Sequence, residues 1–124
     1  MKILIIEDEK IMLNQLVTRF TNEHFDVIFA KDGKLGLDMA ISEKPELILL
    51  DIVLPKMDGM TMMSKLRQSN SDARNVPIIL LTNLNSDEKI MKGIIQDNPS
   101  YYLVKTEWTL DDIVEKVKDT LKMI

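Results

Sequence analysis

Five short runs rich in aliphatic residues alternate with longer stretches of helical period along this chain of 124 residues. The runs are KILII at 2–6, DVIFA at 26–30, LILL at 47–50, IILL at 78–81 and YYLV at 101–104. Runs that are apolar at nearly every position are typical of strands buried on both faces of a parallel sheet. The alternation therefore predicts an α/β fold in which right-handed crossovers place helices on both faces of the sheet.

Helices are expected between these runs, where apolar residues recur at three- and four-residue spacing. Asp8 is placed at the N-cap of the first helix, and Ile41 is expected on the inward face of the second. A polar loop is expected at 70–75. After the first helix, in which Leu13, Leu16, Val17 and Phe20 recur, the expected helices cover about 33–43, 60–69, 86–97 and 110–123.

Charge and composition restrict the class of protein. The net charge is -4, there is no cysteine, and no apolar run approaches the ~18 residues of a membrane span. The N-terminal apolar run is too short for a signal peptide, and no dense Lys/Arg stripe suits nucleic acid. These features favour a single cytoplasmic domain over residues 1–124, which binds neither a membrane nor, by itself, nucleic acid.

Polar residues stand where the predicted strands end. Glu7 and Asp8 end the first strand, Asp51 the third, Thr82 the fourth and Lys105 the fifth. Each has an ordinary explanation, since acids and threonine cap helices and a loop lysine is usually solvated. However, the ligand crevice of an open parallel sheet lies beyond the carboxyl ends of its strands. Their coincidence at one edge favours a shared site.

The residue types indicate the chemistry of such a site. Clustered carboxylates repel one another unless a cation neutralises them. All the candidate side-chain ligands are oxygens, which suits a hard ion such as Mg²⁺. An Asp beside Mg²⁺ can attack phosphorus and form an aspartyl phosphate. Thr82 and Lys105 could then donate hydrogen bonds to the phosphoryl oxygens.

The chain resembles, over essentially its whole length, a response regulator receiver domain of two-component signalling. The motifs that carry this resemblance are the acid pair Glu7–Asp8, the segment DIVLPKMDG at 51–59, the strand ending at Thr82, and YLVK at 102–105. Any one motif alone is weak, but together they are highly specific. The resemblance implies a flavodoxin-like, doubly wound, five-stranded sheet with strand order 2-1-3-4-5.

The resemblance also implies a phosphoacceptor site. Asp51 would accept a phosphoryl group from a sensor histidine kinase or a phosphotransfer protein. Asp8, Asp51 and the backbone carbonyl of Val53 would bind Mg²⁺, and Glu7 would act through a water. Gly59 would supply unusual backbone angles to the turn beside the metal.

The same resemblance implies a switch at the next two strands. Thr82 and Lys105 would bind the phosphoryl group, and Tyr102 would turn inward behind it. The changed face would then signal to a downstream protein partner or effector domain. Such a domain is a phosphoacceptor with self-catalysed transfer, not an enzyme acting on a separate substrate. Because Val53 and Leu84 are apolar, slow autodephosphorylation is expected.

Three positions depart from the family pattern. Thr106 follows Lys105 where proline is usual, and Asn83 stands where the family has a small residue. Residues 98–100, Asn-Pro-Ser, stand where the family has a small Gly-Ala pair. A cis bond costs roughly 2.5–4 kcal/mol before a residue other than proline. We therefore expect a trans bond between Lys105 and Thr106.

Other functions are weighed against this hypothesis. A phosphatase of the haloacid dehalogenase type would need a second Asp two residues after its nucleophile, where this chain has Val53. A receiver that never takes phosphate is a further alternative. The sequence leaves open whether the domain stands alone or belongs to a longer regulator.

Overall fold

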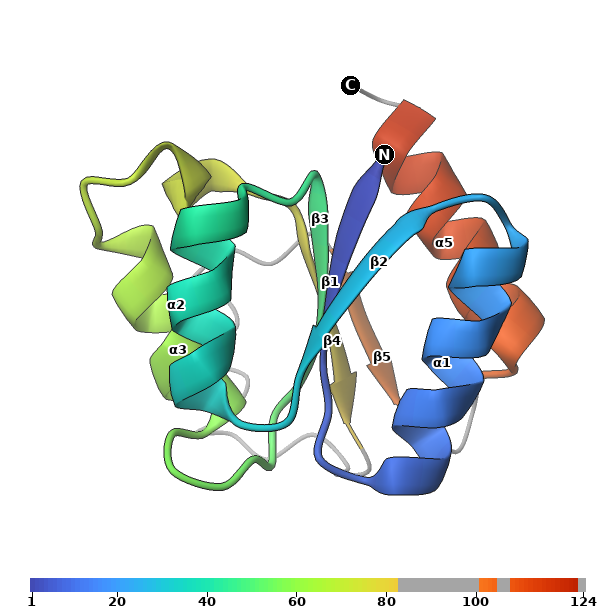
Figure 1. Cartoon of the computed structure of the whole chain (residues 1–124), viewed down its shortest axis with the longest axis horizontal. Helices are drawn as coiled ribbons and strands as arrows, with labels where there is room; N and C mark the ends of the chain where they lie inside the picture. The colour runs from blue at the N-terminus through green and yellow to red at the C-terminus, as the bar shows by residue number, and fades with distance from the viewer. Residues whose placement is uncertain (83–100, 105–107, 123–124) are drawn as a thin grey trace.

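The structure is a computed structural model that describes residues 1–82, 101–104 and 108–122. Five parallel strands form one sheet in the order β2-β1-β3-β4-β5 (Figure 1). The strands are β1 (Lys2–Ile6), β2 (Asp26–Ala30), β3 (Leu47–Asp51), β4 (Ile78–Thr82) and β5 (Tyr101–Val104). The predicted α/β class, parallel sheet and strand order are confirmed.

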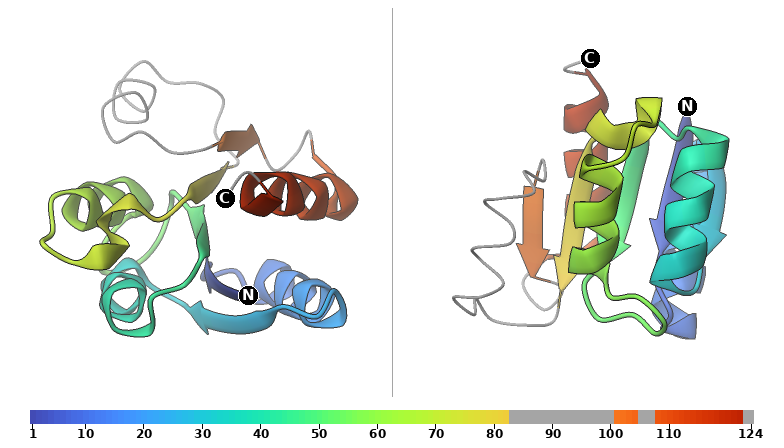
Figure 2. Two further views of the ribbon diagram at one scale, coloured as in Figure 1. Left: turned by 90° about the horizontal axis from the view of Figure 1, so that it is seen from above. Right: turned by 90° about the vertical axis from the view of Figure 1, so that its left-hand side faces the viewer.

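Helices cover both faces of this sheet, as predicted. Helices α1 and α5 lie on one face, and α2 and α3 lie on the other (Figures 1 and 2). Their bounds, with that of a short 3₁₀ helix, are α1 (Lys10–Asn22), α2 (Gly33–Glu43), α3 (Gly59–Arg67), η1 (Asp72–Asn75) and α5 (Leu110–Lys122). The helix expected at 86–97 lies outside the described residues.

Each face of the sheet has its own core. Strand β3 is buried at all five positions, because its alternate side chains point into different helical layers. Leu49 belongs to the same buried cluster as Leu16 and Phe20 of α1, whereas Leu50 belongs to the cluster that contains Met63 of α3. A continuous apolar run is therefore required of a central strand in this architecture.

Some local predictions were wrong. Glu9, not Asp8, is the N-cap of α1, and it makes no side-chain capping hydrogen bond. Ile41 is 39% exposed, on the outer side of α2. The expected polar loop contains η1, because Ser71 accepts a hydrogen bond from the backbone of Ala73, whose side chain is buried.

One further result concerns membranes. Within the part of the chain that the structure describes, no helix combines the length and apolar character that crossing a bilayer requires.

Candidate functional site

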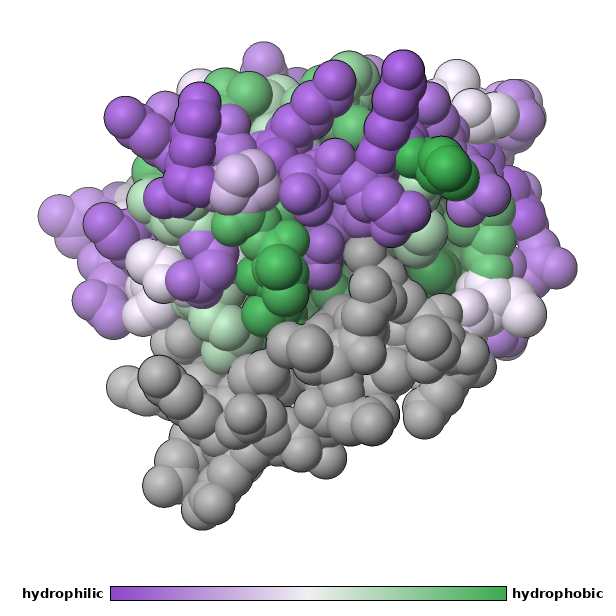
Figure 3. Space-filling view, turned by 90° about the horizontal axis from the view of Figure 1, so that it is seen from below, coloured by the Kyte–Doolittle hydropathy of each residue, from purple (hydrophilic) through white to green (hydrophobic). Residues whose placement is uncertain are grey.

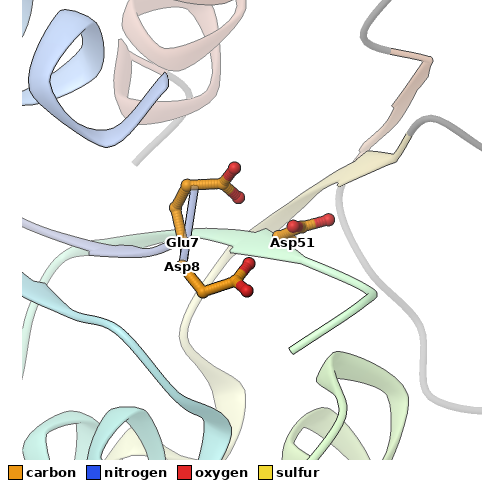
Figure 4. A group of neighbouring side chains, drawn as sticks. All are labelled: Glu7, Asp8 and Asp51. Carbon is orange, nitrogen blue, oxygen red and sulfur yellow. The ribbon is translucent and has the colours of Figure 1, made fainter. Parts of the chain in front are cut away.

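Three carboxylates meet where β1 and β3 end. The residues are Glu7, Asp8 and Asp51, called here the acidic cluster (Figure 4). One ligand oxygen from each lies within 4.8 Å of the others. Glu7 and Asp51 are 1% and 7% exposed, whereas Asp8 faces solvent. The sequence prediction that these acids converge is confirmed.

The sheet register brings these acids together. Ile6 pairs with Leu50, so Glu7 and Asp51 follow the last paired residues of neighbouring parallel strands. Asp51 in turn pairs with Leu81 of β4. Parallel strands leave a sheet at the same edge, and the buried apolar pairs fix the register, because a slip by one residue would reverse every side chain. The core thus determines where the carboxylates stand.

The loop from β3 to α3 begins beside the acidic cluster and is held to Asp51 and the end of β3. The backbone N–H of Val53 donates to Oδ1 of Asp51 at 3.4 Å, and the Val53 side chain is 61% exposed. Farther along, the N–H of Gly59 donates to the carbonyl of Ile52 at 2.7 Å. Asp58 begins α3 by accepting a hydrogen bond from the backbone of Thr61. The base of the loop is therefore held to the end of β3.

Gly59 has a different role from the one predicted. No described glycine has a positive φ, so the expectation of unusual backbone angles at Gly59 was wrong. Instead, a Cβ at Gly59 would lie 2.2 Å from the carbonyl oxygen of Asp51. The left-handed residue of this turn is Lys56, with φ of 65°. Sequence reasoning missed Lys56 because lysine carries no preference for positive φ.

The oxygens of the acidic cluster fit a small divalent cation. Two oxygens bound to one Mg²⁺ lie at most about 4.2 Å apart, twice the typical metal–oxygen distance of ~2.1 Å. The three ligand oxygens lie within 4.8 Å of one another, which is close enough for a hydrated ion to reach them directly or through water. Hard oxygen ligands that carry negative charge are those that Mg²⁺ prefers. The donor set therefore fits the implied metal.

The other predicted site residues lie on or beyond β4 and β5. Thr82 is the last residue of β4 and pairs with Val104, while Tyr102 pairs with Leu80. These strands end at the same edge as β3, as expected for a shared crevice. The side chains of Thr82 and Tyr102, together with Lys105 and its bond to Thr106, lie outside the described residues.

The surface at this edge mixes polar and apolar side chains. Figure 3 looks onto the edge where the strands end, and green hydrophobic groups lie among the purple hydrophilic ones. Exposed apolar residues include Ile11, at 68%, near the start of α1, besides Val53. Of these two, Val53 lies beside the acidic cluster, because its backbone N–H contacts Asp51.

Comparison with known proteins places this geometry in context. The family model described as "Response regulator receiver domain" matches residues 3–118. Response regulator PleD of Caulobacter vibrioides is 32% identical over 113 residues, which are 91% of this chain and 24% of PleD. This chain thus spans about a quarter of the length of that relative.

Solved structures agree in fold. The receiver domain of the Francisella response regulator 1452 has a TM-score of 0.87 and 28% identity, covering 98% of this chain and 97% of that one. The BeF3-activated N-terminal receiver domain of Klebsiella pneumoniae RstA has a TM-score of 0.82 and 30% identity. That alignment covers 98% of each chain.

Proposed function

The chain belongs to the response regulator receiver family, and we propose that Asp51 is its phosphoacceptor. Phosphorylation-activated switching is the general function of this family, and its members are signalling domains of two-component systems. The observation that carries the proposal is the acidic cluster, in which a nearly buried Asp51 stands beside two further carboxylates at the strand ends. The proposed unit is a single receiver domain over residues 1–124.

The acidic cluster would hold Mg²⁺, as receiver domains do through acidic residues. Asp8 and Asp51, with the backbone carbonyl of Val53, are the proposed direct ligands. Glu7 would act through a water. The bound ion would neutralise the carboxylates and the phosphoryl oxygens as they approach. Exposed Asp8 leaves one side of the cluster open to solvent, so an ion and a phosphoryl donor can enter from there.

Asp51 would act as the nucleophile. One of its carboxylate oxygens attacks phosphorus, and a P–O bond forms while the P–N bond of the donor's phosphohistidine breaks. The electron pair of that bond returns to the imidazole nitrogen, which takes up a proton. Strand β3 is buried and its pairing with its neighbours is fixed. The attacking oxygen is therefore held in place before transfer, and little orientational freedom is lost.

The remaining proposed roles concern the phosphoryl group after transfer. Thr82 and Lys105 would bind its oxygens, and Tyr102 would turn inward behind Thr82. The proposed donor is a sensor histidine kinase or a phosphotransfer protein, and the recipient of the signal is a downstream protein partner or effector domain. The exposed apolar side chain of Val53 cannot position an attacking water, which supports slow loss of the phosphoryl group. It also cannot serve as the proton donor that a phosphatase of the haloacid dehalogenase type requires.

The test is phosphorylation by a small-molecule donor. Incubation with phosphoramidate and Mg²⁺ should add one phosphoryl group to the wild-type protein, measured by intact-protein mass spectrometry. Asp51→Asn should remove this addition, whereas Asp58→Asn should keep it, because Asp58 caps α3 and lies outside the acidic cluster. Undiminished labelling of Asp51→Asn would refute the assignment.

A further inference from the structure

The apex of the β3–α3 loop rests on the first turn of α2. The carbonyl of Pro55 accepts hydrogen bonds from the backbone N–H of Met57 at 2.7 Å and of Gly33 at 3.5 Å. The first of these bonds spans two residues around Lys56, whose φ is 65°, which makes a tight γ-turn. A strained turn of this kind persists only where its surroundings hold it. Here the start of α2 supplies that support.

Gly33 makes this contact possible. A Cβ at Gly33 would lie 1.8 Å from the carbonyl oxygen of Met57 and 2.7 Å from its carbonyl carbon. Both are backbone atoms, so a change of rotamer could not relieve the clash. Gly36, one turn later, differs, because its Cβ would meet the buried side chain of Ile6, at 2.6 Å from Cδ1 and 3.0 Å from Cγ1, and not the backbone of the loop. Of these two glycines of α2, only Gly33 thus requires the absence of a side chain for the loop to keep its place.

Asp32 reinforces the same contact from the helix side. Its Oδ1 caps α2 by accepting a hydrogen bond from the N–H of Leu35 at 2.7 Å. Its Oδ2 lies 3.9 Å from the ammonium of Lys56, and its side chain is only 16% exposed. One carboxylate therefore both begins α2 and faces the cation at the apex of the loop.

The loop is consequently held at two places. Its base is fixed to β3 by Gly59 and Ile52, and its apex is fixed to α2 by Gly33. Between these points lies Val53, whose N–H contacts Asp51 and whose carbonyl is the proposed metal ligand. We propose that Gly33 is a positioning residue for the metal and phosphoryl site, because it lets α2 seat the loop that carries Val53. This inference rests on the function proposed above.

The first test compares two glycines of one helix. Gly33→Ala and Gly36→Ala make the same substitution within the first turns of one helix, but only Gly33→Ala displaces the loop backbone. Groups that support metal ligands typically change metal affinity by 10–100-fold. We therefore expect Gly33→Ala to weaken Mg²⁺ binding by roughly tenfold, measured by calorimetry, and Gly36→Ala to leave the affinity within about twofold.

A readout without metal separates positioning from general instability. In the Mg²⁺-free protein, backbone amide chemical shifts of residues 52–58 should move in Gly33→Ala and stay near wild type in Gly36→Ala. Thermal unfolding of both variants, recorded in the same buffer, reports their stability. A general loss of stability would not confine the shift changes to this loop.

A second pair of variants changes Lys56, within the loop itself. Valine is strongly disfavoured at positive φ, whereas glycine is not. Lys56→Val should therefore displace the apex and weaken Mg²⁺ binding, and Lys56→Gly should retain wild-type affinity. The matched control is Lys44→Val. Lys44 also has a positive φ, of 49°, but it lies at the C-cap of α2, at the opposite edge of the sheet from the acidic cluster. Lys44→Val should leave Mg²⁺ affinity unchanged.

The outcomes distinguish this inference from the proposed function. If wild type binds Mg²⁺ and is phosphorylated at Asp51, wild-type affinity in both Gly33→Ala and Lys56→Val would overturn the positioning role. If Gly33→Ala does not fold, loss of affinity in Lys56→Val but not in Lys44→Val still supports it. If wild type itself is not phosphorylated, the proposed function fails. The amide shifts of metal-free Gly33→Ala and Gly36→Ala then decide whether Gly33 seats the loop.

Discussion

Acids at the amino edge of the sheet are paired with cations, whereas the acidic cluster at the carboxyl edge places three acids beside one another. At the amino edge, acids face cations: Lys2 contacts Glu43 at 3.3 Å, and Glu23 at the end of α1 contacts both Arg19, at 3.3 Å, and Lys118 of α5. At the carboxyl edge, the acidic cluster places three carboxylates within 4.8 Å of one another. Like charges this close disfavour the folded state unless a cation joins them.

The ionisation of Glu23 illustrates the difference. Its pKa lies below the ordinary 4.5, because Lys118 donates a hydrogen bond to its carboxylate and Arg19 donates another. Charge at the amino edge therefore supports the packing of α1 against α5. The acidic cluster at the carboxyl edge instead gathers three carboxylates, which is the pattern expected of residues that serve a metal and a phosphoryl group.

The largest effect on Mg²⁺ binding and phosphorylation is expected from Asp8→Ala. Loss of a direct ligand should weaken Mg²⁺ binding by more than about tenfold and remove phosphorylation by phosphoramidate. The variant should be at least as stable as wild type without Mg²⁺, because one repelling charge is gone and Asp8 does not cap α1. Calorimetry and thermal unfolding measure the two effects.

Glu9→Ala is the matched control, since Glu9 is the adjacent acid and makes no capping hydrogen bond. It should retain Mg²⁺ binding. Equal losses in the two variants would mean that general negative charge, and not the acidic cluster, attracts the ion.

Gly59→Ala should produce the largest change in stability. The new Cβ would lie 2.2 Å from the Asp51 carbonyl oxygen and 2.9 Å from Cα of Ile52, both in the backbone. Overpacking of this kind costs about 1–3 kcal/mol, which urea denaturation can measure. Gly36→Ala is the control, because its new Cβ would meet the Ile6 side chain and not the backbone beneath the acidic cluster. If Gly59→Ala unfolded no more easily than Gly36→Ala, the close packing of Gly59 against the backbone of Asp51 and Ile52 would not matter for stability.

Val53→Asn should shorten the life of the phosphorylated state severalfold. The Val53 side chain is exposed beside Asp51, and an amide there could hold a water near phosphorus. Loss of the phosphoryl group can be followed by mass spectrometry after the donor is removed. Leu54→Met is a suitable control, since Leu54 is buried in the core. A wild-type half-life of seconds in Mg²⁺ would contradict the expected slow hydrolysis.

Smaller effects, confined to stability, are expected at the amino edge, beginning with Glu23→Gln. Because the folded-state pKa of Glu23 is lowered, its charge stabilises the protein above its ordinary pKa, and this contribution disappears as the pH falls through the lowered value. Glu23→Gln should thus lower the midpoint of thermal unfolding by a few degrees at pH 7, and by less near pH 3. Phosphorylation should be unchanged.

Glu43→Gln removes the more exposed partner of Lys2 and should change the midpoint less than Glu23→Gln, because exposed pairs contribute little. A Glu23→Gln effect that grew as the pH fell would contradict the assigned origin of its pKa.

The sequence predicted the framework of the site well. Apolar runs and helical periods are local properties of the chain, and they were enough to give the five strands, their order through the family resemblance, and the convergence of the acidic cluster. The sequence is a weaker guide at single positions: Glu9 and not Asp8 is the N-cap of α1, and Ile41 is 39% exposed although the helical period predicts it on the inward face. A helical period fixes a face only to within a neighbouring position.

The sequence by itself therefore determined which residues end the strands, because alternating strands and helices leave few topologies. Only the tertiary structure decided how the loop beside Asp51 is held. The left-handed φ of Lys56 and the contacts of Gly33 and Gly59 depend on backbone segments that meet only when α2, α3 and β3 are packed together. Such close approaches arise from the spacing between packed elements, and no local pattern of residues encodes that spacing.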